Sequence, residues 1–132
     1  MLLPCEVAVK CLLPPVRAMI AKTLTTKYNL TQIDAARLLG ISQPAISLYD
    51  RKMRGKAINL EQDPELTELI ENLTDALARD DLAHKDFIQR FCEICKATRA
   101  KGLLCQMHKT FDPTISVEKC QLCTSINALK CI

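Results

Sequence analysis

The fold of this 132-residue chain is decided by residues 30–49, which read LTQIDAARLLGISQPAISLY. Thr31 is the predicted N-cap of a helix that continues to about Leu39, and Gly40 is predicted to end it. Ser42 predicts a second N-cap, with Pro44 in the first turn of the next helix, where proline is tolerated. We therefore expect two short helices joined by a tight glycine turn.

The spacing within this segment is typical of a helix-turn-helix. Ala36 is small where the second helix has to cross closely, and Gly40 permits a left-handed turn. Ile46 is placed to fill the core between the two helices, whereas Gln43 and Ser47 point outward on one face. In this motif the first turn of the second helix enters the major groove of DNA. The alternative is an ordinary helical hairpin with polar caps.

The polar residues of the second helix and the basic residues after it are candidate DNA contacts. A glutamine makes a bidentate contact to adenine, and serines reach a base or a phosphate. The lysines and arginines that follow the helix neutralise phosphates. The predicted contacts are Ser42, Gln43, Pro44, Ser47, Arg51, Lys52, Arg54 and Lys56.

The front of the chain extends this pattern. Residues 3–17, LPCEVAVKCLLPPVR, together with the segment above, resemble archaeal helix-turn-helix transcriptional regulators. In some of these the same front end is fused to a thiamin-phosphate synthase domain, which the remaining residues here are too few to hold. The resemblance covers about residues 1–56. It implies binding to double-stranded promoter DNA as a homodimer, with Lys10 and Arg17 as further DNA contacts.

Hydrophobic periodicity predicts an all-α chain in three parts. The parts are a helix-turn-helix domain of about four helices (1–60), acidic linking or dimerisation helices (61–91) and a cysteine-rich module (92–132). Nine basic against three acidic residues fall in 1–60, and the ratio is reversed in 61–91. Pro14 predicts a helix start, and Asp63 predicts another, followed by an apolar stripe that makes either a core helix or a dimer helix. A further helix is expected to start at Asp80 or Asp81.

Two Cys-x-x-Cys pairs, with a cysteine and a histidine between them, have the spacing of metal ligands. The basic residues Lys96, Arg99 and Lys101 after the first pair are expected to favour thiolates. Cys5 and Cys11 are interpreted as packing residues, His84 as a surface residue, and Cys131 is not assigned a role. The candidate ligands are Cys92, Cys95, Cys105, Cys120 and Cys123, with His108 as an alternative.

Several occupancies of these ligands stay open at the level of sequence. Zinc takes either the two pairs or the first pair with Cys105 and His108. An iron–sulfur cluster takes four of the five cysteines, which leaves one thiol spare, as suits a redox-responsive site. Disulfides or inert buried thiols are the remaining interpretations. A cytosolic metal or redox site is the default because clustered cysteines outside secreted proteins seldom form structural disulfides.

The sequence favours a regulator whose cysteine site senses redox state or metal and iron–sulfur status. The alternative is a constitutive regulator whose C-terminal module is held by structural zinc or by disulfides. An enzyme is not expected, because a thioredoxin-like Cys-x-x-Cys needs strands and none is predicted; no small-molecule substrate is expected either. Charged residues at Glu6, Lys10 and Arg17 interrupt any secretion signal, and no apolar run reaches eighteen residues, so we expect a cytoplasmic protein with no membrane span.

Overall fold

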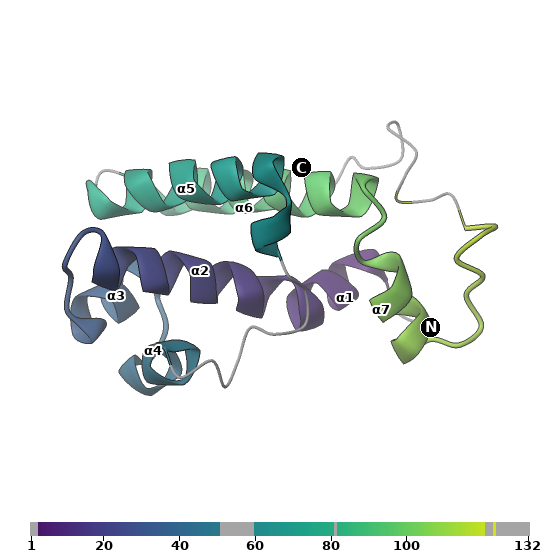
Figure 1. Ribbon diagram of the computed structural model, residues 1–132, viewed down its shortest axis with the longest axis horizontal. Coiled ribbons are helices and arrows are strands. Elements are labelled where there is room, and N and C mark those ends of the chain that lie inside the picture. Colours follow the sequence, from purple (N-terminus) through teal and green to yellow (C-terminus); the bar gives the residue numbers. More distant parts are fainter. Residues whose placement is uncertain (1–2, 51–59, 81, 121–122, 124–132) are drawn as a thin grey trace.

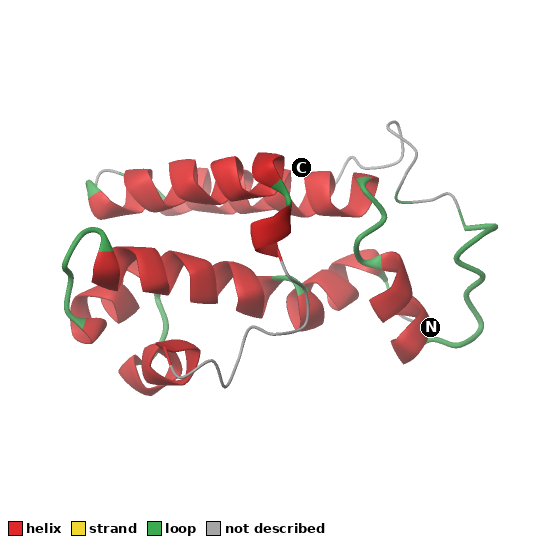
Figure 2. Ribbon diagram, in the orientation of Figure 1, coloured by secondary structure: helices red, strands yellow, loops and turns green. Residues whose placement is uncertain are grey.

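The computed structural model describes residues 3–50, 60–80, 82–120 and 123, which form helices arranged in two layers (Figures 1 and 2). One layer holds two long antiparallel helices, and the other holds the N-terminal helices (Figure 1). The described residues contain no strand, so the all-α prediction is confirmed for them. The elements are α1 (Pro4–Cys11), α2 (Leu13–Thr26), α3 (Gln32–Leu39), α4 (Gln43–Asp50), the 3-10 helix η1 (Leu60–Gln62), α5 (Pro64–Ala78), α6 (His84–Ala100) and α7 (Cys105–Phe111).

The helix start predicted at Pro14 is found within one residue, because α2 begins at Leu13 with proline in its first turn. A separate helix, α1, precedes it, so α1 to α4 are the helices of the N-terminal part, in line with the expected number of about four. Leu12 is the residue between α1 and α2, and its side chain is fully buried in the core. Pro4 begins α1, where its missing N–H costs nothing because the first N–H groups of a helix have no partner within it.

The two layers meet between α2 and α5. Val16, Ile20 and Leu24 recur at intervals of four residues along α2, and all three are fully buried. Residues four apart lie on one face of an α-helix, so these side chains form a continuous apolar ridge. This ridge belongs to a core that α5 shares, because α2 and α5 pack against each other. Burying each such side chain contributes about 1.5–3 kcal/mol of transfer free energy.

The apolar stripe of α5 faces the protein's own core. Leu66, Ile70, Leu73 and Leu77 are all buried. Asp63 caps the helix as predicted, since its Oδ1 accepts a hydrogen bond of 3.1 Å from the backbone N–H of Leu66. The interpretation of this segment as a core helix is therefore confirmed.

The helix α6 begins later than expected. Asp80 takes a left-handed conformation (φ 53°) just after α5, and the next helix starts only at His84. From there α6 continues to Ala100, so the boundary predicted at 91/92 lies inside one helix. His84 is exposed, as expected. None of the helices in the described part of the chain is both long and apolar enough to cross a membrane.

A pair of salt bridges ties the end of α6 to the start of α5. Lys101 Nζ lies 3.0 Å from a carboxylate oxygen of Asp63 and 2.8 Å from one of Glu65. Lys101 therefore connects the end of α6 to the N-terminus of α5. The negative charges of the two acidic residues also interact favourably with the positive end of the α5 dipole.

Candidate nucleic-acid interface and cysteine clusters

The predicted turn between α3 and α4 is formed as the sequence indicated. Thr31 Oγ1 accepts a 3.1 Å hydrogen bond from the N–H of Asp34 and caps α3. Gly40 ends that helix in the left-handed region, at φ 67° and ψ 30°. Ser42 Oγ accepts a bond of 3.3 Å from the N–H of Ala45 in the first turn of α4. The turn is thus set by local hydrogen bonds and one positive-φ glycine.

Packing fixes the angle between these helices. Ile46 on α4 is fully buried, and Ala36 on α3 is only 5% exposed. Both α3 and α4 contact each other and α2. The small residue and the apolar plug therefore occupy the buried positions that the sequence predicted for them.

The start of α4 presents a polar surface to solvent. Ser42, Gln43 and Pro44 are exposed, and Ser47 is half-buried. Gln43 Nε2 donates a 2.6 Å hydrogen bond to Oε1 of Gln32, the first residue of α3. This bond links the two helix starts at the surface and orients the Gln43 amide. Gln32 was not singled out from the sequence, because only the fold brings it beside a residue eleven positions away.

The predicted basic contacts do not all lie near this surface. Lys10 is exposed, and its Nζ is 5.3 Å from the centre of the Phe111 ring on α7. Arg17 is half-buried on α2. Figure 1 shows α1 and α7 toward the other end of the long axis from α3 and α4. Lys10 is therefore not grouped with Gln43. The predicted contacts Arg51, Lys52, Arg54 and Lys56 lie outside the described residues.

Six of the cysteines fall into two groups, and the first consists of Cys92 and Cys95 on α6 and Cys5 on α1. Cys92 and Cys95 are half-buried on α6, and Cys5 on α1 lies within electrostatic range of Cys95. Arg99, only 5% exposed, lies one turn further along α6. Cys5 is exposed, so its interpretation as a packing residue was wrong, whereas Cys11 is buried as predicted.

The electrostatics of this first group differ from the prediction. Burial raises the pKa of the Cys95 thiol and outweighs Arg99, whose charge and hydrogen bond to the thiol act in the opposite direction. The expectation that the basic residues favour a thiolate is thus wrong for Cys95, because desolvation dominates there. Lys101, one of those residues, is paired with Asp63 and Glu65 instead.

The second group consists of Cys105, Cys120 and Cys123. These cysteines line a cavity of about 200 Å³ between α1, α7 and the segment after α7. Burial, and then the neighbouring Cys123 and Cys120 thiols, raise the pKa of Cys105. Neither predicted zinc set is reproduced by this grouping, because Cys92 and Cys95 do not line the cavity. The lining residues are Pro4, Val7, Leu104, Cys105, His108, Ile115, Val117, Glu118, Cys120 and Cys123.

The spacing of the cysteines along the chain could not reveal these groups. Cys5 joins Cys95 only because α1 packs near the C-terminal helices, where it also contacts α7. Within the described residues, no group of three or more His, Cys, Asp or Glu side chains is close enough to enclose a metal ion. Cys105, His108, Cys120 and Cys123 nevertheless line one cavity, together with Glu118.

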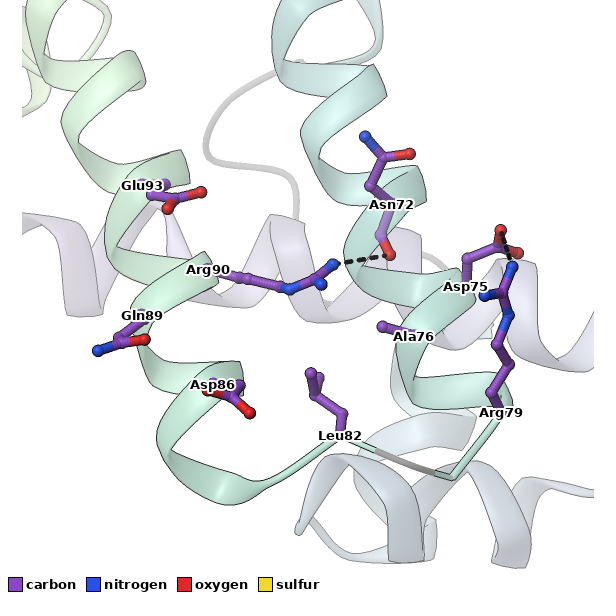
Figure 3. Close-up of a pocket in the computed structure, with 9 residues that line it drawn as sticks. All are labelled: Asn72, Asp75, Ala76, Arg79, Leu82, Asp86, Gln89, Arg90 and Glu93. Carbon is purple, nitrogen blue, oxygen red and sulfur yellow. Dashed lines mark hydrogen bonds and ion pairs between the residues drawn. The ribbon is translucent and has the colours of Figure 1, made fainter.

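A larger open groove of about 630 Å³ runs between α5 and α6 (Figure 3). Arg79 pairs with Asp75 at 3.5 Å, and Arg90 donates a 3.5 Å hydrogen bond to the backbone carbonyl of Asn72 (Figure 3). Asp86 and other polar side chains complete the lining. The sequence indicated a charged outer face here but not a groove. Both arginines bind groups of the groove lining, namely the Asp75 carboxylate and the Asn72 carbonyl. This is the pattern of a solvent-exposed face between two helices.

Comparisons with models of protein families, with curated proteins and with solved structures find no match for this chain. The function therefore has to be inferred from the exposed start of α4 and the two thiol groups.

Proposed function

We propose that this protein is a sequence-specific DNA-binding transcriptional regulator of the helix-turn-helix type, acting in the cytoplasm as a homodimer. The observation that carries the proposal is the pair α3–α4: a left-handed Gly40 turn, a buried Ile46 plug and an exposed Gln43 at the start of α4. The resemblance of residues 1–56 to archaeal helix-turn-helix regulators supports the same function.

The start of α4 has the chemistry to recognise a base pair. An α-helix fits the major groove, and a glutamine amide donates to N7 and accepts from the N6 amino group of adenine. The Nε2 of Gln43 carries two protons, so its bond to Gln32 leaves one proton and the oxygen for this contact. Gln32 therefore orients the amide of Gln43 and leaves that amide a donor and an acceptor for a base.

Phosphate contacts come from the basic residues that follow α4. Arg51, Lys52, Arg54 and Lys56 fall directly after the recognition helix in sequence. Each phosphate that they neutralise adds affinity for every DNA sequence and steepens the dependence of binding on salt. A homodimer doubles these contacts and matches the two-fold symmetry of a palindromic site.

The cysteine-rich C-terminal part is proposed to bind metal or an iron–sulfur cluster and to make the regulator responsive to redox state or metal supply. Its thiols gather in two groups around α6 and α7. A constitutive regulator with a purely structural zinc ion is the second candidate. It is favoured by the α7 region, where the helix itself has no buried residue.

The DNA-binding proposal is tested with Gln43→Ala, using duplex DNA selected by the wild-type chain from a random pool. We expect affinity for the selected site to fall by about 1–3 kcal/mol, with binding to unrelated DNA unchanged. Gln89→Ala is the matched control, because Gln89 is an exposed glutamine on α6 and not on α3 or α4. Equal specific affinity of Gln43→Ala and wild type contradicts the assignment of α4.

A further inference from the structure

The cavity between α1 and α7 brings together four side chains that bind soft metals. Cys105 and His108 are three residues apart on α7, so they lie on one face of that helix. Cys120 and Cys123 are the second Cys-x-x-Cys pair, and both line the same cavity. Val7, on α1, contributes an apolar wall.

Local hydrogen bonds bring the second pair back toward α7. Asp112, buried at the end of α7, accepts bonds at Oδ1 from the backbone N–H (3.3 Å) and the hydroxyl (2.5 Å) of Thr114. The carbonyl of Ser116 then accepts bonds from the backbone N–H groups of Lys119 (3.2 Å) and Cys120 (2.8 Å). These two turns lie between α7 and Cys120, which lines the same cavity as Cys105.

This region lacks the apolar packing that stabilises the rest of the protein. Leu104 is buried, but from there to Cys120 the structure buries only Asp112, a polar residue. Small modules without a sufficient hydrophobic core are usually held by metals or disulfides. No disulfide joins Cys105, Cys120 or Cys123 in the structure, so all three sulfurs are present as potential metal ligands.

We infer that Cys105, His108, Cys120 and Cys123 together bind one zinc ion. Three sulfurs and one imidazole nitrogen make a tetrahedral Cys₃His set, which is common in structural zinc sites. Among the described residues, no three His, Cys, Asp or Glu side chains are close enough to hold an ion. Zinc binding therefore requires the four side chains to move closer together. Cys5, Cys92 and Cys95 are then a separate thiol group and not ligands.

The ligand set is new relative to the two zinc sets that the sequence indicated, both of which included Cys92 and Cys95. It rests on the metal-binding part of the proposed function and is independent of DNA binding by α4. The two parts are distinguishable because they reside in different helices, α7 and α4.

The experiment uses the full chain, purified with reductant and zinc, then freed of loosely bound metal. We expect one zinc per chain, and a cobalt-substituted sample with the absorption of tetrahedral thiolate coordination. His108→Ala and Cys120→Ser should lower zinc affinity at least roughly tenfold. The matched controls His84→Ala and Cys92→Ser should retain full binding, because His84 is exposed on α6 and Cys92 belongs to the other group.

Several outcomes overturn the ligand assignment. Loss of zinc in Cys92→Ser, full binding in Cys120→Ser, iron with acid-labile sulfide, or a metal-free wild type each contradict it. His108→Cys guards against misfolded variants, because it restores four ligands and should bind cobalt with stronger thiolate absorption. Binding of selected DNA, measured on the same wild-type samples, shows separately whether the regulator proposal stands.

Discussion

The turn between α3 and α4 is tested most sharply by Gly40→Ala. Gly40 has φ 67°, where an L-residue pays about 1–2 kcal/mol. An added Cβ meets no atom within 4 Å, so no steric clash adds to this penalty. Alanine also restricts the unfolded chain, which offsets about 0.4–1 kcal/mol. We therefore expect a net loss of about 1 kcal/mol in the free energy of unfolding, a roughly fivefold change in the folding equilibrium.

The assay is urea unfolding followed by far-ultraviolet circular dichroism, with the slope m unchanged. Gly40→Asn should recover most of the loss, because asparagine tolerates this region, as Asn29 already does at φ 55°. Gly102→Ala is the matched control, since Gly102 has φ 72° and an added Cβ makes only ordinary contact with Cys105 Sγ at 4.0 Å. Both alanine variants should lose similar stability, but only Gly40→Ala should weaken specific DNA binding. A Gly40→Ala protein as stable as wild type refutes the reasoning.

Two further predictions concern packing and charge. Ile46→Ala should lower the free energy of unfolding by about 2–5 kcal/mol and Ile46→Val by about 0.5–1.5 kcal/mol, because Ile46 is fully buried; a smaller loss in urea unfolding for alanine than for valine would show that Ile46 does not fill the core. The hydrogen bond from Leu66, and then Lys101, lower the pKa of Asp63. Its contribution to stability is therefore present above its ordinary pKa and is lost as pH falls below about 4 through the lowered folded value. Thermal unfolding of Asp63→Asn should consequently depend less on pH than that of wild type in this acidic range, and identical profiles would contradict the role of the carboxylate.

The sequence predicts those features of this protein that depend on neighbouring residues. Thr31, Gly40 and Ser42 act through bonds within four residues, so their roles follow from the local sequence. The stripe of α5 follows equally well, because a period of 3.6 residues is visible without knowledge of its partner.

Features that depend on distant contacts could not be predicted in this way. The hydrogen bond between Gln32 and Gln43, and the approach of Cys5 to Cys95, both depend on how helices pack. The thiol of Cys95 carries a raised pKa because burial outweighs its basic neighbour, and burial is a tertiary property. The grouping of Cys105 with Cys120 likewise needs the turns after α7, which spacing alone does not specify.

The central claim, that this protein recognises a DNA sequence through α4, is tested most directly by selection from a random duplex pool. If the protein binds as the proposed homodimer, the wild-type chain should enrich one two-fold symmetric sequence, with half-sites about one helical turn apart or a multiple of it. Gln43→Ala, selected in parallel, should lose preference at one position in each half-site. Enrichment of no sequence by the wild-type protein, at salt concentrations where non-specific binding is weak, would contradict the claim.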